Sequence, residues 1–258
     1  MKRYVELGAG IGSVLLATAY NLRPNPVIAI GIEAQLQSFS LLNRTCQKIM
    51  SLERSGPYIG SIIPMLADIR QVVGKDDSLT TVKARSVDLI TANPPFAPFG
   101  SGTLSKDPQI RAAKFELRGG VEEYMQVASD LLAPKGRFVC TFWSRSDQRF
   151  KEAAQKADLK IIRKVRVLMG TTSVNTPHLC TYDLVHSDNF EFASNHLEVT
   201  SITMSERREN SFLNLQDQLH ILSDGSCYEE LELNITHSRH QSISSPYRTI
   251  LKELSICK

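Results

Sequence analysis

The chain has 258 residues, of which 42% are hydrophobic and 22% are charged, and its formal net charge is +3. These proportions are ordinary for a globular protein, and no apolar run approaches the length of a membrane span. The N-terminus lacks the apolar core of a signal peptide, and the five cysteines contain no Cys-x-x-Cys pair. We therefore expect a cytoplasmic protein with no membrane partner, no metal site and no disulfide framework.

Strand-like and helix-like segments alternate over the first 187 residues. Short apolar runs predict strands at 3–7, 27–33, 61–68, 87–92, 137–143, 159–168 and 179–186. Helices are predicted after a glycine-rich turn at 8–12, over about 34–51, within 121–136 and over about 147–157. This alternation predicts a doubly wound α/β domain, in which ligands bind at the carboxyl ends of the strands.

A glycine-rich turn with the sequence "ELGAGIG", residues 6–12, joins the first strand to the first helix. Glycine lets the backbone turn sharply and approach a ligand without a Cβ atom in the way. The third glycine comes one residue earlier than in the dinucleotide-binding pattern G-x-G-x-x-G, and Glu6 precedes the turn. We interpret the turn as a site for a ligand that carries an ammonium group; the alternative is a turn that serves packing alone.

Two further acids are predicted at the ends of the next two strands. Glu33 ends the second strand, where a carboxylate can accept both hydroxyls of a ribose. Asp68 closes the third strand, where it can accept a hydrogen bond from an adenine amino group. The alternatives are a solvated surface Glu33 and an Asp68 that caps a helix. With Glu6, the two acids outline an adenosine that carries a charged amino-acid tail.

The fourth strand ends at Asn93-Pro94-Pro95-Phe96. Tandem prolines fix the backbone, so the Asn93 side chain and the Pro94 carbonyl can face one point. Two acceptors that converge in this way fit a planar NH₂ donor, and the Phe96 ring can stack on a flat substrate. Transfer of an activated methyl group to such an amine depends mainly on positioning. The alternative is an ordinary loop turn of the Pro-Pro type.

Together these segments resemble a known family. The stretches "ELGAGIG", "GIEAQ" and "DLITANPPF" are similar to the cofactor loop, ribose acid and catalytic motif of class I S-adenosylmethionine-dependent methyltransferases that act on exocyclic amines. The longer stretch 93–138 resembles the bacterial family that methylates adenine N6 of tRNA-Val next to the anticodon, the tRNA1(Val) enzymes. Position 96 departs from that family's more frequent Asn-Pro-Pro-Tyr, since Phe96 stands there.

The resemblance implies a Rossmann-like fold with a seven-stranded, mostly parallel sheet, helices on both faces and an antiparallel last strand. It implies S-adenosyl-L-methionine as cofactor and an RNA, expected to be a tRNA, as partner. Residues implied in cofactor binding are Glu6, Gly8, Ala9, Gly10, Gly12, Glu33, Ala34, Asp68, Ile69 and Asn93. The implied catalytic residues are Asn93, Pro94, Pro95 and Phe96, and Arg111 and Lys114, in the loop that follows, are candidate RNA contacts.

The resemblance covers residues 1–187, and we treat this segment as the methyltransferase domain. Residues 188–258 are rich in Ser, Asn, Thr and Arg, and we expect a polar extension that packs on the sheet or contacts RNA.

Three alternative functions remain open at this point. The acceptor could be an adenine or guanine of rRNA, or a protein glutamine as in release-factor methyltransferases, whose side chain offers the same planar NH₂. A third interpretation is a non-enzymatic scaffold that binds the cofactor or RNA. The reason for this interpretation is that the sequence begins almost at the first strand, whereas the family normally carries a further segment before that strand.

Overall fold

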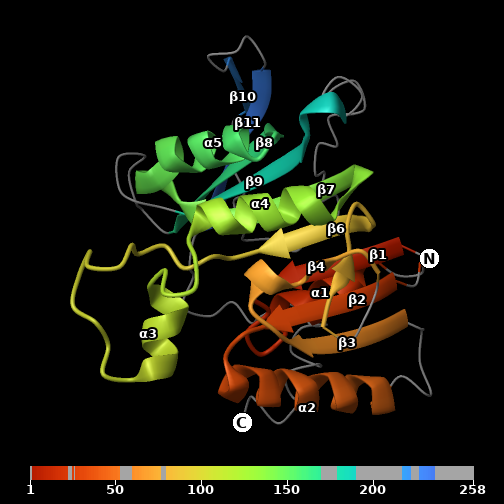
Figure 1. The fold of residues 1–258 in the computed structure, drawn as a ribbon. Helices are drawn as coiled ribbons and strands as arrows, with labels where there is room; N and C mark the ends of the chain where they lie inside the picture. The colour runs from red at the N-terminus through yellow and green to blue at the C-terminus, as the bar shows by residue number, and fades with distance from the viewer. Residues whose placement is uncertain are drawn as a thin grey trace, which may run out of the picture.

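The structure is a computed structural model, which describes residues 2–22, 25, 27–52, 60–76, 80–169, 179–189, 217–221 and 227–235. Within these residues one sheet has the strand order β10–β11–β8–β9–β7–β6–β1–β2–β3 (Figure 1). Its strands are β1 (Lys2–Leu7), β2 (Val27–Glu33), β3 (Gly60–Leu66), β6 (Val87–Ala92), β7 (Leu132–Trp143), β8 (Leu159–Met169), β9 (Leu179–His186), β10 (Asp217–Ile221) and β11 (Cys227–Ile235). A separate small sheet pairs β4 (Val73–Gly74) with β5 (Val82–Lys83).

Seven strands of the large sheet are the seven that the sequence predicts. Strands β3, β2, β1, β6 and β7 are parallel to one another, and β9 runs antiparallel between β7 and β8. The predicted fold class is therefore confirmed. Strands β10 and β11 were not predicted; they widen the sheet, because β11 pairs with β8. Residues 190–216, 222–226 and 236–258 of the C-terminal extension lie outside the described residues.

Helices cover both faces of the sheet and enclose two apolar clusters. Helices α1 (Ser13–Asn21) and α2 (Leu36–Leu52) contribute Leu15 and Leu42 to one cluster. Helices α4 (Val121–Leu131) and α5 (Asp147–Lys156) contribute Met125 and Phe150 to the other, larger cluster. Burial on both faces holds the parallel strands in place, so their carboxyl ends form a rigid edge.

Three local differences separate the structure from the sequence-based expectation. Strand β3 ends at Leu66, and Asp68 caps the 3-10 helix η2 (Ile69–Gln71) instead of closing the strand. Helix α4 ends at Leu131 and the extended backbone of β7 begins at once, ahead of the predicted strand at 137–143. The segment expected as a loop after the proline turn contains a short helix, α3 (Pro108–Lys114).

No helix in the described part of the chain is both long and apolar enough to cross a membrane.

Candidate functional site

A pocket of about 430 Å³ lies at the carboxyl ends of the parallel strands. It is large enough for a nucleoside-sized ligand. Of the residues that the sequence singles out, the pocket brings together Gly8, Gly10, Glu33, Ala34, Asp68, Ile69, Asn93 and Pro95. The pocket lining does not include Glu6, Ala9, Gly12, Pro94, Phe96, Arg111 or Lys114.

The glycine turn after β1 brings the backbone close to its neighbours. Gly8 and Gly12 have φ angles of 75° and 94°, in the left-handed region that side chains other than glycine rarely adopt. A Cβ atom on Gly8 would lie 3.0 Å from the Tyr124 hydroxyl, and one on Gly12 would lie 2.7 Å from Cδ1 of Leu42. The positive φ angles therefore favour glycine at both positions, and Gly8 and Gly10 also line the pocket.

Glu33 joins the glycine turn to the start of α2. One of its carboxylate oxygens accepts a hydrogen bond from the Gly10 N–H at 2.9 Å, and the other accepts from the Gln35 N–H at 2.7 Å. The residue is 7% exposed and lines the pocket. Because a carboxylate has about four lone-pair sites, two hydrogen bonds leave capacity for ligand hydroxyls.

Glu6 lies beneath the turn and not in the pocket wall. It is 5% exposed, and its Oε2 atom has no hydrogen-bond partner. Burial, with a smaller contribution from the negative charge of Glu33, raises the pKa of Glu6 to about 8, while a hydrogen bond from the Leu15 backbone opposes this shift. The structure thus separates Glu6 from the other two acids, because Glu6 is buried outside the pocket lining.

Asp68 has a partner within the chain. Its carboxylate accepts from the Arg70 backbone N–H at 3.0 Å and forms two side-chain hydrogen bonds with the Arg70 guanidinium at 2.8 and 2.7 Å. These bonds with Arg70 lower the pKa of Asp68, so the group is ionised at neutral pH. The capping role that the sequence left open as an alternative is present, and Asp68 also lines the pocket.

The Asn93–Phe96 turn places its residues in different surroundings. Asn93 is exposed and lines the pocket beside Pro95, whereas Pro94 is buried. The Phe96 ring packs edge-on against Phe142 with centroids 5.5 Å apart and stacks with Trp143 at 6.2 Å. The structure therefore shows the Phe96 ring in contact with two aromatic side chains outside the pocket lining.

Helix α3 forms the opposite wall of the pocket and has no buried residue. Its pocket-facing residues include Gln109, Ala112 and Ala113, and Gln109 Nε2 donates a 2.7 Å hydrogen bond to Ser38 of α2. Arg111 and Lys114 are outside the lining and form no ion pair with any described residue, although Lys114 lies 5.7 Å from the centroid of the Phe115 ring.

The sequence contains a local signal for the start of α3. Asp107 caps the helix by accepting from the N–H groups of Gln109 and Ile110, and Pro108 occupies its first turn. An Asp-Pro pair is a typical helix start. No comparable signal marked Tyr124, whose approach to Gly8 depends on how α4 packs.

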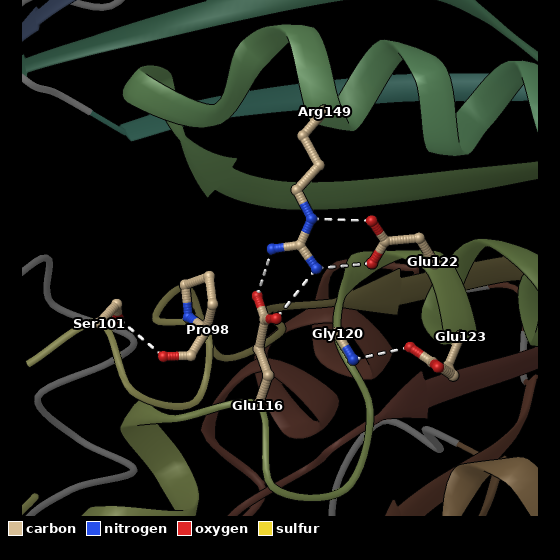
Figure 2. A network of polar contacts seen from close by, with 7 residues as sticks. All are labelled: Pro98, Ser101, Glu116, Gly120, Glu122, Glu123 and Arg149. Atoms are coloured by element: carbon tan, nitrogen blue, oxygen red, sulfur yellow. Dashed lines mark hydrogen bonds and ion pairs between the residues drawn. The ribbon is translucent and has the colours of Figure 1, made fainter.

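An arginine behind the pocket holds the loop between α3 and α4. Arg149 of α5 donates hydrogen bonds to the carboxylates of Glu116 and Glu122 (Figure 2). Between these two acids in the chain lie Arg118 and Gly119, which line the pocket. The Glu123 carboxylate closes the start of α4 by accepting from the Gly120 N–H at 2.7 Å.

Comparisons with known proteins find similar solved structures and no match in sequence. No family model and no curated protein matches it. Similar solved structures include an S-adenosylmethionine-dependent methyltransferase from Aquifex aeolicus, with 10% identity, coverage of 71% of this chain and 82% of the other, and a TM-score of 0.48. A predicted O-methyltransferase from Agrobacterium tumefaciens has 14% identity, coverage of 71% and 73%, and a TM-score of 0.47.

A putative RNA methyltransferase from Pyrococcus horikoshii is also similar, with 16% identity, coverage of 73% and 74%, and a TM-score of 0.44. Such low identities carry no information on substrate. The seven strands have the order β3–β2–β1–β6–β7–β9–β8, and the reversed β9 is the antiparallel last strand that the family resemblance implies. The chain has a Rossmann-like, doubly wound α/β fold.

Proposed function

We propose that the protein is an S-adenosylmethionine-dependent N-methyltransferase that acts on an exocyclic amine of RNA, namely adenine N6 of a tRNA in the anticodon loop. The observation that carries the proposal is one pocket lined by the glycine turn, Glu33, Asp68 and Asn93. A cofactor subsite and an amine-binding turn are adjacent there, as methyl transfer requires. An anticodon loop suits this site because its bases are already unstacked or easily extruded.

The residues of the pocket fit the cofactor. Gly8 and Gly10 present backbone without side chains, the Glu33 carboxylate can accept ribose hydroxyls, and Asp68 can accept from an adenine amino group. The backbone beside these acids, at Ala34 and Ile69, would border the adenosine. When bound, S-adenosylmethionine supplies a methyl group activated by its sulfonium.

The side-chain oxygen of Asn93, a residue that lines the pocket, would accept one N–H bond of the target amine. The Pro94 carbonyl would accept the other, although Pro94 itself is buried and outside the pocket lining. This arrangement holds the amine in place and directs its lone pair, and the prolines keep both acceptors fixed. After accepting the methyl group, the amine would have to release a proton. The exposed position of Asn93 leaves solvent able to receive that proton.

Charge on α3 favours RNA as the partner. Arg111 and Lys114 sit on α3 outside the pocket lining, so they can contact phosphates while the pocket is filled. The exposed Phe99, in the segment between the proline turn and α3, offers an additional stacking surface.

Methylation of a protein glutamine is the second candidate. The position of Phe96 favours it, because the ring packs against Phe142 and Trp143. A ring held there is not required to stack on a nucleobase, and a glutamine acceptor needs no such stacking. A glutamine side chain could use Asn93 and Pro94 in the same way as an adenine amine.

The deciding experiment compares the wild type with Asn93→Ala. We expect the variant to lose methyl transfer to tRNA, measured by mass spectrometry of nucleosides, while S-adenosylhomocysteine binding measured by calorimetry stays within about threefold, since cofactor contacts made by Glu33 and the glycine turn remain. Undiminished tRNA methylation by Asn93→Ala would contradict the proposal. Transfer to release factor but not to RNA would favour glutamine, and absence of S-adenosylhomocysteine binding at millimolar concentration would favour a scaffold.

A further inference from the structure

We propose that Arg149 is a positioning residue for the Asn93–Phe96 turn and that it acts through Glu116. This inference rests on the proposed function, since it assigns the turn to amine binding. Arg149 lies on α5, outside the pocket lining. Its effect on the site would therefore pass through the residues that it contacts.

The Arg149 guanidinium forms bidentate hydrogen bonds with each of two carboxylates. Its Nη1 and Nη2 atoms donate to Glu116 at 2.7 and 2.9 Å, and its Nε and Nη2 atoms donate to Glu122 at 2.7 and 2.6 Å (Figure 2). These bonds raise the pKa of Arg149 and lower that of Glu122. Bidentate pairs of this kind combine strength with a defined geometry that lysine does not reproduce.

The loop is shaped to admit the guanidinium. A Cβ atom on Gly120 would lie 2.6 Å from Arg149 Nη2 and 2.7 Å from Glu116 Oε2. A side chain at this position would displace one of the two charged groups from its present place, and the residue follows directly on the pocket-lining Gly119.

The two carboxylates differ in burial and in what they are connected to. The Glu116 side chain is 8% exposed, whereas the Glu122 side chain is 42% exposed. The Glu116 backbone N–H donates to the Ala97 carbonyl at 3.0 Å, and the Ala97 N–H donates to the Lys114 carbonyl at 3.2 Å. Ala97 directly follows Phe96, so Glu116 connects Arg149 to the turn, and Glu122 does not.

This difference supplies a matched test. Glu116→Gln and Glu122→Gln each remove one negative charge from the same guanidinium with little change in size. We expect Glu116→Gln to lower kcat by roughly tenfold or more, because small misplacements of a reacting group are costly. Glu122→Gln should keep kcat within about threefold, and both variants should keep S-adenosylhomocysteine affinity within about threefold, because the strand ends are untouched.

A second readout does not depend on activity. Trp143 is the only tryptophan of the chain, and it stacks with Phe96. Its fluorescence spectrum and its quenching by acrylamide should change in Glu116→Gln and stay as in the wild type in Glu122→Gln. If the wild type had no methyltransferase activity, the proposed function would be wrong. The Trp143 fluorescence alone would then decide whether Arg149 and Glu116 position the turn.

Arg149→Lys tests the same ion pair from the arginine side, since it keeps the positive charge and loses the bidentate hydrogen bonds. We expect it to follow Glu116→Gln in both kcat and Trp143 fluorescence, and it carries the test if Glu116→Gln does not fold. Equal effects of Glu116→Gln and Glu122→Gln on kcat and on Trp143, or no effect of either, would overturn the proposal. Losses of kcat that simply follow the thermal stability of the variants would overturn the proposal as well.

Discussion

The two walls of the pocket are built in different ways. One wall consists of strand ends, with Glu33 held at the end of β2 between two cores of buried side chains. The other wall is α3, a seven-residue helix with no buried residue that contacts α2 through the hydrogen bond from Gln109 to Ser38. Burial fixes the first wall, whereas the second is held by a few polar contacts.

This difference suggests that the two walls of the pocket have different functions. Rigid strand ends suit groups that must keep a fixed geometry against the cofactor. A helix with few contacts suits a surface that adjusts to a large partner and opens to admit ligands. We therefore expect changes in the strand-end wall to act on cofactor binding and changes on α3 to act on the acceptor.

The largest effect is expected at the strand-end wall. Glu33→Gln keeps the shape of the side chain but turns an N–H₂ group toward a backbone N–H of Gly10 or Gln35 and removes the charge that would bind ribose hydroxyls. Charge-assisted hydrogen bonds contribute about 1.5–3 kcal/mol each, so affinity for S-adenosylhomocysteine should fall roughly 100-fold by calorimetry.

Gln109→Ala is the matched change on the α3 wall. It removes one neutral hydrogen bond, to Ser38, and should weaken S-adenosylhomocysteine binding by no more than about fivefold. Equal losses in Glu33→Gln and Gln109→Ala would show that the two walls hold the cofactor alike, and the comparison would fail.

An intermediate effect is expected when the outer charges of α3 are reversed. The double variant Arg111→Glu and Lys114→Glu should raise the KM for tRNA by about tenfold at low salt and flatten its salt dependence, because each lost phosphate contact removes part of the counterion release. Cofactor affinity should not change, since neither residue lines the pocket.

The control for this variant is Arg44→Glu with Lys48→Glu. These two exposed cations lie on α2, outside the pocket lining, and the substitutions change the net charge by the same amount. We expect the control to change the KM for tRNA by less than about twofold. A similar rise in both double variants would mean that net charge, and not the α3 surface, attracts RNA.

The smallest effect concerns the group beneath the strand-end wall. Burial raises the pKa of Glu6 to about 8, above its ordinary value of 4.5, so this carboxyl favours the folded state most below pH 4.5 and loses that contribution as the pH rises to 8. Glu6→Gln has no charge to lose.

The thermal midpoint of Glu6→Gln relative to the wild type should therefore increase by several degrees between pH 5 and pH 8, as followed by circular dichroism. A difference that is the same at both pH values would contradict the raised pKa. No such pH-dependent change in the thermal midpoint is expected from α3, because this helix contains no buried residue.

Much of the strand-end wall could be predicted from the sequence. Glu33 and Asn93 follow β-branched apolar runs, and parallel strands place their carboxyl ends at the same edge, so chain order alone brings these residues together. Asp68 shows the limit of this reasoning, because its place beyond β3 and its pairing with Arg70 depend on how the chain leaves the strand.

By itself, the sequence determined seven strands and the helices α1, α2, α4 and α5 in their chain order, the fold class and the cluster of residues at the strand ends. Hydrophobic periodicity and glycine turns are local properties of the chain. Only the tertiary structure decided the position of α3, the contact of Phe96 with Trp143 and the pairing of Arg149 with Glu116. Those contacts join segments that are distant in the chain, and packing and charge pairing in three dimensions select them without leaving a periodic signal in the sequence.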